Sequence, residues 1–318
     1  MNPESFYKNK KVLVVGAGGM IGSCLVKALS ILGCDLRLVY HNAPNNPTKG
    51  AIISVADITK PEVWDELASN DVIFHLAAHE SGNFEPEEDL KTNALSVLYL
   101  LESCRRKEVF PKIVFASSSN LVGAPDKMPV DETFKDNPLT IFAIHKLTAE
   151  EYLKLYFHDF GIPSIALRLA NVYGPSMEMS LSLHSTLNKM VNNAVAGKPL
   201  KLFANKDKIR DFLYIDDAAR AFLAAGSLPN EKSGVYIAGS EEGKSFKTIV
   251  ELVAELVSKT SGRRPEIIID RETPIKAVEM RNFVADSSKF KKASGWKPQT
   301  MLRSGLQKTI NYFLKINN

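Results

Sequence analysis

The sequence predicts an α/β protein, with a Rossmann-type doubly wound parallel sheet followed by a smaller mixed α/β carboxy-terminal lobe. Short, β-branched apolar runs alternate with segments of helical periodicity over the first part of the chain. The first of these runs passes directly into the glycine-rich turn GAGGMIG (16–22). Apolar strands separated by helices indicate a parallel sheet that is covered by helices on both faces.

Each expected element follows from a local pattern. In the segment after the glycine turn, for example, Leu25, Val26, Leu29 and Leu32 recur at helical spacing. Strands are expected at KVLVV (11–15), LRLVY (36–40), AIISV (51–55), DVIFHLAA (71–78), KIVFASSS (112–119) and PSIALRLA (163–170). Helices are expected at SCLVKALSILG (23–33), PEVWDELAS (61–69), about 89–107 and 139–159.

The alternation becomes irregular after about Pro175, where further prolines punctuate the chain. Helices are expected at 183–197 and 246–260, and short strands at PLKLF (199–203), GVYIAG (234–239) and PEIIID (265–270). We therefore predict a dinucleotide-binding domain over residues 1–175 and a substrate-binding lobe over 176–318, with some chain crossing between them. Ligands of open α/β sheets bind at the carboxyl ends of the strands, so the site is expected between sheet and lobe.

Composition excludes several classes of function. The 318 residues include 40 basic and 36 acidic side chains that are interspersed along the chain, which disfavours a nucleic-acid partner. No uninterrupted apolar run approaches the roughly 18 residues of a membrane span, so no membrane association is expected. Cys24, Cys34 and Cys104 lack metal-ligand spacing, and we predict a cytoplasmic protein with reduced cysteines and no metal site.

The glycine turn predicts a phosphate-binding site. Gly16, Gly19 and Gly22 let the backbone approach a pyrophosphate, and Met20 and Ile21 begin the helix whose N-terminus favours its negative charge. The second strand ends in Tyr40 and His41 and lacks the acidic residue that usually binds the ribose of NAD. The cofactor is therefore predicted as NAD or NADP, with the choice left open.

At this point a set of ordered motifs resembles the extended short-chain dehydrogenase/reductases of the NAD-dependent epimerase/dehydratase family, which act mostly on nucleotide sugars. The resemblance spans nearly the whole chain. It rests on GAGGMIG, Asp57-Ile58, DVIFHLAA, Asn93, FASSSNLVG (115–123), Lys146, RLANVYGP (168–175), RDFLYIDD (210–217) and ADSSKFKKASGWKP (285–298).

The resemblance implies a role for each matched residue. Asp57 and Ile58 would contact the adenine, Leu76, Ala77 and Ala78 would line the cofactor, and Asn93 would support the backbone near the active site. Ser118 would hydrogen-bond a substrate hydroxyl, and Lys146 would hold the nicotinamide ribose. Asn171, Arg210 and Arg281 would grip the substrate diphosphate, while Arg168 is expected to pair structurally.

Two departures from the family pattern refine the predicted function. Ser119 and Asn120 stand where the 4,6-dehydratases of the family have an Asp-Glu pair, which disfavours that reaction. Phe142 stands four positions before Lys146, where the family has its catalytic tyrosine. Loss of a general base typically costs about 10² to 10⁴ in rate, so activity is slowed without loss of binding.

Three groups are candidates to replace the phenol. His145 and Lys146 lie on the same helix face as Phe142, and an imidazole titrates in the useful range. His79 and Glu80 follow the cofactor-lining LAA in a loop that the family places at the sugar, with a polar substrate contact as the alternative role. Lys146 would act as a base if burial lowered its pKa. His75, within an apolar strand, is expected to be a core histidine.

We predict an NAD(P)-dependent oxidoreductase acting on a nucleotide-sugar ring hydroxyl, either as an epimerase, usually at C4, or as a dehydrogenase/reductase. The alternative is a catalytically silent nucleotide or sugar-nucleotide sensor or scaffold. A flavonoid, steroid or isoprenoid ketone as substrate is disfavoured by Arg210. The resemblance also implies a homodimer through a four-helix bundle of residues 89–107 and 139–159, with Leu95, Leu98, Leu101, Leu147, Tyr152 and Leu155 as compatible apolar positions. Residues around 79–88 and 176–208 are expected to determine substrate specificity.

Overall fold

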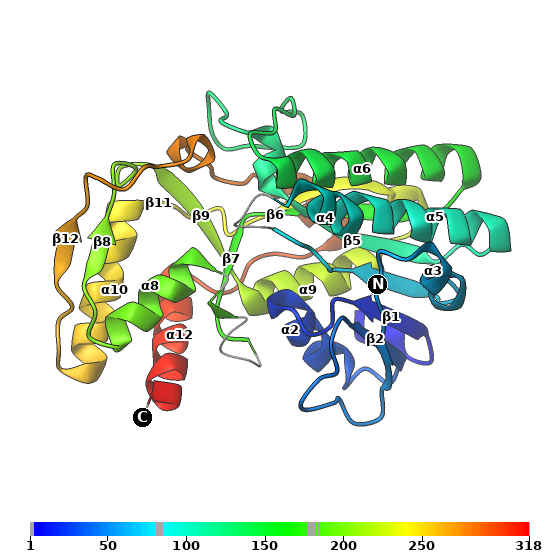
Figure 1. The fold of residues 1–318 in the computed structure, drawn as a ribbon, viewed down its shortest axis with the longest axis horizontal. Helices are drawn as coiled ribbons and strands as arrows, with labels where there is room; N and C mark the ends of the chain where they lie inside the picture. Colours follow the sequence, from blue (N-terminus) through cyan, green and yellow to red (C-terminus); the bar gives the residue numbers. More distant parts are fainter. Residues whose placement is uncertain (1–2, 81–84, 177–181, 184, 318) are drawn as a thin grey trace.

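A large parallel sheet forms one lobe of the molecule, and a smaller lobe packs beside it (Figure 1). The computed structural model describes residues 3–80, 85–176, 182–183 and 185–317. The parts of the expected specificity segments at 81–84, 177–181 and 184 lie outside these residues.

Seven strands form the large sheet, in the order β10-β6-β5-β4-β1-β2-β3, and all neighbours are parallel. This order places the ends of β1, β4 and β5 side by side in the middle of the sheet, which confirms the predicted fold class. The strands are β1 (Lys11–Val15), β2 (Asp35–Tyr40), β3 (Ile52–Val55), β4 (Val72–His75), β5 (Lys112–Ser118), β6 (Ser164–Leu169) and β10 (Gly234–Ala238).

Helices cover both faces of the sheet, as the continuous apolar strands require. On one face, α2 (Met20–Leu29) and α9 (Ile215–Gly226) pack on Val12, Val14 and Phe74. On the other, α3 (Pro61–Leu67), α5 (Ser96–Lys107) and α6 (Ile141–Phe160) pack on Leu13 and Ile73. In Figure 1 these two layers lie below and above the sheet.

Strand β10 corrects one sequence-based expectation. Its residues, GVYIA, were expected in the smaller lobe but pair in parallel with β6 as an edge strand of the large sheet. Helix α9 precedes it and also returns to this sheet. A buried apolar run is equally suited to either lobe, and only tertiary packing decides between them.

The expected helix over 89–107 is interrupted. It begins as α4 (Pro86–Leu90), continues as a π-helical segment, η1 (Lys91–Leu95), and resumes as α5. The expected strand over 71–78 ends at His75, and the Leu76 amide still donates to the Val15 carbonyl at 2.9 Å. Both differences occur beside the carboxyl end of β4. π-Helical turns are rare in proteins and are often found at functional sites.

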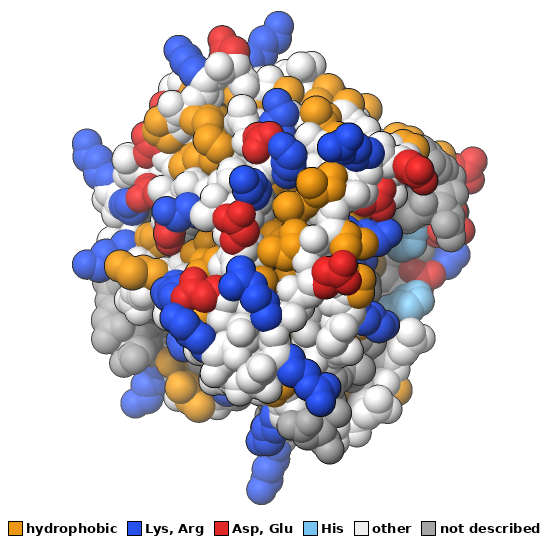
Figure 2. All heavy atoms as spheres, turned by 90° about the vertical axis from the view of Figure 1, so that its left-hand side faces the viewer, with side chains coloured by type: hydrophobic (Ala, Val, Ile, Leu, Met, Phe, Trp, Pro, Cys, Tyr) orange, Lys and Arg blue, Asp and Glu red, His pale blue; other side chains and the backbone are white. Residues whose placement is uncertain are grey.

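The smaller lobe has its own core between short sheets and three helices. A three-stranded sheet has the order β11-β9-β7, and β12 pairs with β8. Charged side chains of both signs are interspersed with apolar ones on the face that Figure 2 shows. The remaining elements are α1 (Pro3–Tyr7), η2 (Ser119–Val122), β7 (Asn171–Tyr173), α8 (Thr186–Val195), β8 (Leu200–Leu202), β9 (Ile209–Tyr214), η3 (Asn230–Lys232), β11 (Gly243–Ser245), α10 (Phe246–Ser261), β12 (Ile267–Ile269), η4 (Ala277–Met280), α11 (Ser288–Ser294) and α12 (Leu302–Asn317).

The three cysteines are free, as expected. Among the described residues, no helix combines the length and the apolar character that crossing a bilayer requires.

Candidate active site

The glycine turn is closely packed between β1 and α2. Gly16 adopts φ = +81°, and a Cβ there would lie 2.6 Å from the Ala77 amide nitrogen. A Cβ on Gly22 would collide with the Gly16 carbonyl oxygen, and one on Gly19 would lie 3.3 Å from the same atom. The turn therefore has no room for side chains at the start of α2, and a backbone that a ligand can approach closely at a helix N-terminus suits a pyrophosphate.

The ends of β2 and β3 provide polar side chains beside this turn. A Cβ on Gly18 would lie 3.1 Å from the Tyr40 ring, so that ring packs directly on the turn, and His41 is exposed. Asp57 accepts hydrogen bonds from the Thr59 hydroxyl and amide at 2.6 and 3.0 Å, which lower the pKa of its carboxyl. The Ile58 carbonyl accepts from the buried Trp64 indole at 3.0 Å.

Lys146 is enclosed at the carboxyl end of the sheet. Its residue is only 1% exposed, and its Nζ lies 4.4 Å from the Phe115 ring centroid and 5.6 Å from that of Phe142. Within the described residues, Nζ has no hydrogen-bond partner. Burial lowers the pKa of Lys146 to about 7, although the charge of Glu150 opposes the shift.

Ser118 ends β5 and is partly exposed. Its hydroxyl accepts a hydrogen bond from the Asn120 amide at 3.1 Å and so caps η2. Lys146 contacts Phe115 on the same strand, and its charge acts on His75, the last residue of the neighbouring strand β4, so Lys146 lies on the carboxyl side of these strands.

The loop after β4 is fixed by the π-helical segment. Asn93 is buried, its Nδ2 donates to the His79 carbonyl at 2.5 Å, and its Oδ1 accepts from the His79 amide at 3.2 Å. The His79 ring bonds Asp89 through Nδ1 at 2.7 Å. Leu76 and Ala77 are partly buried, whereas Ala78 and Glu80 are exposed.

The other two histidines at this end differ from His79. His145 has a buried Nδ1 with no hydrogen-bond partner among the described residues, and burial lowers its pKa against the opposing charge of Asp89. His75 is fully buried, bonds the Ser96 hydroxyl at 2.9 Å, and has its pKa lowered to about 3 by burial. The expectation of a core role for His75 is confirmed.

Arg210 and Arg281 lie next to each other without carboxylate partners in the described part of the chain. Arg210 donates to the carbonyls of Glu279 and Arg281, and Arg281 donates to the Ser119 carbonyl at 2.9 Å. Burial lowers the pKa of both, that of Arg281 to about 10 with help from the Arg210 charge. Asn171, on β7, donates to the Asp211 carbonyl at 3.1 Å. The charge of Glu279 partly opposes the shift at Arg210, and two adjacent guanidinium groups favour a bound anion.

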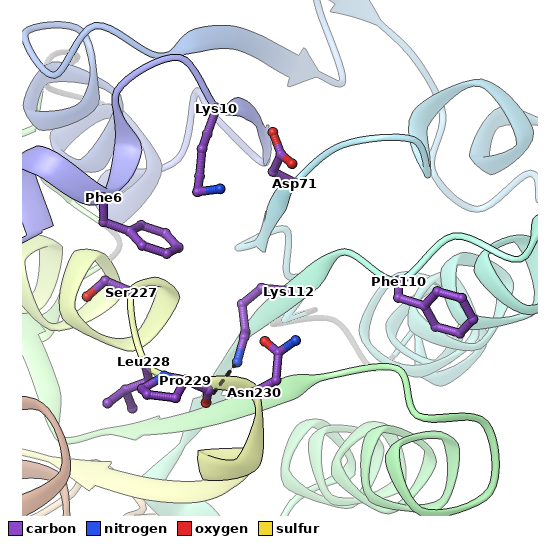
Figure 3. Close-up of a pocket in the computed structure, with 9 residues that line it drawn as sticks. All are labelled: Phe6, Lys10, Asp71, Phe110, Lys112, Ser227, Leu228, Pro229 and Asn230. Atoms are coloured by element: carbon purple, nitrogen blue, oxygen red, sulfur yellow. Dashed lines mark hydrogen bonds between the residues drawn. The ribbon is translucent and has the colours of Figure 1, made fainter. Parts of the chain in front are cut away.

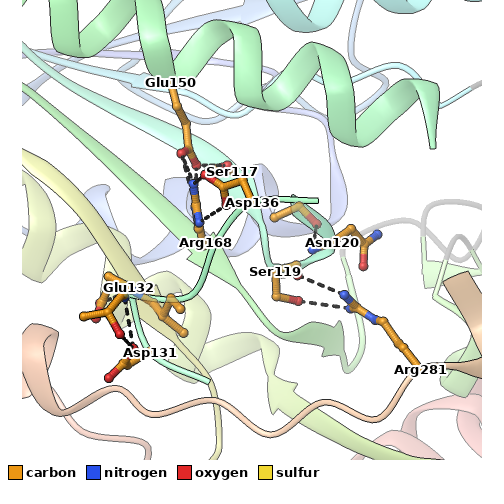
Figure 4. A network of polar contacts seen from close by, with 12 residues as sticks. Ser117, Ser119, Asn120, Asp131, Glu132, Asp136, Glu150, Arg168 and Arg281 are labelled. Carbon is orange, nitrogen blue, oxygen red and sulfur yellow. Dashed lines mark hydrogen bonds and ion pairs between the residues drawn. The ribbon is translucent and has the colours of Figure 1, made fainter. Parts of the chain in front are cut away.

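Arg168 has a different environment, as Figure 4 shows. Its guanidinium bonds Glu150 at 2.6 Å and Asp136 at 2.7 Å, and Glu150 also accepts from Ser117. This buried network confirms that Arg168 pairs structurally. Figure 4 also shows Arg281 directed toward Ser119.

A cavity of about 290 Å³ lies at the end of the large sheet opposite to the candidate site (Figure 3). It adjoins the amino ends of β1, β4 and β5, where Lys112 donates to the Pro229 carbonyl at 3.2 Å. Because the glycine turn and Ser118 lie at the carboxyl ends, this cavity is separate from the candidate site. A second cavity, of about 460 Å³, lies between α8 and β8 in the expected specificity segment.

Asp89 is the residue of this region that sequence analysis missed. Its carboxylate is hydrogen-bonded to His79, and its charge raises the pKa of His145 against the effect of burial. In the sequence, however, Asp89 belongs to an acidic run, PEEDL, of the kind that commonly begins a helix. A histidine and an acid ten residues apart give no periodic signal. Among the described residues, no cluster of three or more His, Cys, Asp or Glu side chains could hold a metal ion.

Comparisons with known proteins identify the family and the fold of the chain. The sequence profile of the NAD dependent epimerase/dehydratase family matches residues 12–239. A putative UDP-glucose 4-epimerase of Methanocaldococcus jannaschii is 31% identical, over 96% of this chain and 99% of that protein. The UDP-glucose 4-epimerase of Thermotoga maritima with UDP-glucose superimposes with a TM-score of 0.85 at 28% identity, covering 96% of this chain and 99% of that one. The Thermus thermophilus UDP-glucose 4-epimerase in complex with NAD gives 0.80 at 27% identity, covering 95% and 98%.

Proposed function

The chain belongs to the NAD dependent epimerase/dehydratase family, and on this basis we propose that it is an NAD-dependent epimerase of nucleotide sugars, with a UDP-hexose as substrate and C4 as the reacting carbon. The observation that carries the proposal is the buried, unpartnered Lys146 amine at the carboxyl end of the sheet. An amine buried without a partner lowers stability, so its presence in this position fits a functional role better than a structural one.

The residues at the strand ends fit a nicotinamide dinucleotide. In this proposal the amides of the glycine turn bind the pyrophosphate, Asp57 and Ile58 border the adenine, and Tyr40 and His41 lie toward its ribose. Lys146 holds the nicotinamide ribose. The bound cofactor would supply reversible hydride transfer at the sugar carbon.

The arginine pair fits the substrate diphosphate. Arg210 and Arg281 are fixed by main-chain carbonyls, and the charge of Glu279 only partly offsets that of Arg210. A diphosphate placed there would form charge-assisted hydrogen bonds with both, while Asn171 would add a neutral donor. Ser118, at the end of β5, would then donate to the oxygen on the reacting carbon.

Epimerisation is favoured over dehydration by the residues after Ser118. Ser119 is buried beside Arg281, and the Asn120 main-chain amide donates to the Ser118 hydroxyl. The hydroxyl of Ser119 and the carboxamide of Asn120 do not supply the acid and base that elimination of water requires. We place Phe142 at the position of the family's tyrosine, which means that another group carries the proton of the sugar hydroxyl.

We also propose a homodimer through α5 and α6. On α6, Ile144 and Leu155 are 49% and 51% exposed, and their spacing of three turns puts them on one face. Leu101 was expected at this surface, but it is fully buried against the sheet and is not available to a partner.

The proposal is tested by incubating the purified protein with NAD and a panel of sugars linked to UDP, GDP, CDP and dTDP. Conversion of a UDP-hexose to its C4 epimer, detected by proton NMR, is the expected result. A sugar nucleotide that binds in calorimetry but is neither converted nor able to reduce the cofactor would instead favour a silent sensor or scaffold. Accumulation of reduced cofactor with an oxidised sugar would favour a dehydrogenase.

A further inference from the structure

We infer that His79 carries the proton of the reacting sugar hydroxyl and that Asp89 is the residue that positions its imidazole. This inference rests on the proposed function, because it assigns the group that replaces the phenol missing at Phe142. His79 would act as the catalytic residue, and Asp89 would act through it as a positioning residue.

The main chain of His79 is held in place from both sides. Asn93 accepts from the His79 amide and donates to its carbonyl, at 3.2 and 2.5 Å. Asn93 belongs to the π-helical segment η1, is fully buried, and therefore anchors the loop to a rigid element. This anchoring fixes the backbone from which the imidazole extends.

The imidazole in turn has a defined orientation. Its Nδ1 lies 2.7 Å from Oδ1 of Asp89, whose residue is 4% exposed. A carboxylate only accepts hydrogen bonds, so in the neutral imidazole this contact favours the tautomer with the proton on Nδ1 and a lone pair on Nε2. The His79 side chain is 40% exposed, so a substrate can approach the ring. This is the arrangement in which a carboxylate fixes the tautomer of a general base.

The His79–Asp89 pair lies beside the helix that carries Phe142. Helices α4 and η1 pack against α6, and the charge of Asp89 acts on His145. His145 is three residues after Phe142 and next to Lys146, on the same side of α6. The pair is therefore adjacent to the position at which the phenol is missing.

The other candidates are less well placed to exchange a proton. The His145 ring has one nitrogen buried without a partner in the described part of the chain. The Lys146 amine is enclosed between aromatic rings and is 1% exposed as a residue, so a sugar hydroxyl reaches it less easily than His79.

The proton and the hydride leave the sugar by different routes. The O–H bond of the sugar hydroxyl breaks and its proton moves to Nε2 of His79, whose Nδ1–H remains bonded to Asp89. The electron pair of the C–H bond leaves with its hydrogen as hydride to the NAD that the proposed function supplies, and a carbonyl forms. In the return step, hydride adds to the opposite face of the carbonyl carbon, and the carbonyl oxygen takes the proton back from Nε2 of His79. Among the described residues, the carboxylates in contact with the ring are Asp89 and, at 3.9 Å from Nε2, Glu85, and the titratable groups across on α6 are His145 and Lys146.

The test compares His79→Gln, Asp89→Asn and Asp89→Glu with the wild-type protein. The chain offers a matched control in His158 and Asp159, an exposed pair on the same helix as Phe142 with a similar Nδ1 to Oδ1 distance of 2.6 Å. His158→Gln and Asp159→Asn therefore remove the same kind of contact away from the site. For each variant, kcat and KM, calorimetric binding of the sugar nucleotide, thermal unfolding and side-chain nitrogen NMR of the free protein are measured.

We expect His79→Gln to lower kcat by about 10² to 10⁴ with sugar-nucleotide binding retained. Asp89→Asn is expected to lower kcat at least about tenfold, to change the pH profile of kcat, and to shift the His79 NMR signals from the Nδ1–H to the Nε2–H tautomer, because the amide can donate to Nδ1. Asp89→Glu restores part of the rate and the original tautomer. The control variants retain wild-type values.

A wild-type enzyme that turns over while folded His79→Gln keeps its full kcat would overturn the inference and leave the proposed function standing. The inference is likewise overturned if Asp89→Asn leaves both the pH profile and the tautomer unchanged. An inactive wild-type protein would overturn both the inference and the proposed function, since His79 would then have no reaction to serve.

Discussion

The amine of Lys146 lies 5.6 Å from the centre of the Phe142 ring. In the sequence these residues are four apart, one turn of α6, and the helix brings them together on its inner side. An amine that is buried against aromatic rings with no hydrogen-bond partner in the described structure is retained at a cost in stability.

Replacing Lys146 with Met is expected to stabilise the cofactor-free protein and abolish turnover. Because the folded-state pKa is about 7, against an ordinary value of 10.5, the unfolded chain binds more protons between these values, so this group's contribution to stability rises with pH. The cost of burying the ammonium is therefore fully present below about pH 7, where the gain from Lys146→Met should be roughly 1–3 kcal/mol, and it declines toward about pH 10.

Urea unfolding across this pH range measures the gain. Lys154→Met, on an exposed part of the same helix, is the control and should show no such dependence. A Lys146→Met protein that is less stable than wild type near neutral pH would show that the amine has a stabilising partner.

Restoring the phenol is expected to make His79 dispensable. In Phe142→Tyr the hydroxyl would extend from a ring that already adjoins Lys146, where the ammonium favours a phenolate. We expect the kcat of the double variant, Phe142→Tyr with His79→Gln, to be at least about tenfold higher than that of His79→Gln alone. Phe142→Leu in the same background supplies no proton acceptor and should recover nothing; equal recovery by Leu would refute this explanation.

Removing one of the paired arginines is expected to weaken substrate binding selectively. A hydrogen bond to a charged group contributes about 1.5–3 kcal/mol, so Arg210→Met should raise the Kd for UDP and for the sugar nucleotide by about 10- to 100-fold. Binding of NAD should not change. Calorimetry with each ligand measures the difference, and Arg303→Met, in an exposed ion pair with Glu255, is the control. A uniform loss of affinity for NAD and UDP would instead indicate general unfolding.

Arg168→Met should instead lower the stability of the protein and leave substrate binding largely unchanged. Its removal leaves the buried Glu150 without its main partner and also frees Asp136, which is expected to cost about 3–5 kcal/mol in the free energy of unfolding. At a temperature at which the variant is still folded, its Kd for UDP should stay within about threefold of the wild-type value. That change is smaller than the effect of losing one charged hydrogen bond. Chemical unfolding and calorimetry on the same sample distinguish the two effects, and a large loss of UDP affinity in folded protein would contradict a purely structural role.

Charging the exposed face of α6 is expected to separate the proposed dimer. Leu155→Glu would place a carboxylate at a position that is 51% exposed in one chain, and burying it against a partner would be strongly unfavourable. Light scattering should report a dimer for wild type and a monomer for Leu155→Glu. Ile31→Glu changes a residue that is 82% exposed outside α5 and α6, and it should remain dimeric. A monomeric wild type would rule out the assembly.

The positions of the central strands could be anticipated because their apolar runs are bounded by turns and helices. β1, β2, β5 and β6 lie within about a residue of the expected limits. β10 could not be assigned to a sheet, because GVYIA is an apolar run whose partner is chosen only by tertiary packing. The π-helical turn at Lys91–Leu95 also leaves no mark in the helical periodicity of the segment.

In the candidate site, too, some features follow from local sequence and others depend on tertiary packing. The glycine turn follows from local chemistry, since Gly16 and Gly22 have no room for a side chain. The His79–Asp89 bond and the proximity of Arg210 to Arg281 depend on long-range packing that spacing does not encode. Sequence reasoning selected His79 and both arginines as candidates but could not supply their partners.

The most direct test of the central claim is to follow a UDP-hexose that carries deuterium on C4 through the reaction with the NAD-bound protein in ordinary water. Oxidation and reduction at that carbon by the cofactor predict a C4 epimer that keeps its deuterium, detected by mass spectrometry and NMR. An epimer in which the label is replaced by solvent hydrogen, or a bound sugar nucleotide that is never converted, would contradict the assignment of this chain as an NAD-dependent nucleotide-sugar epimerase.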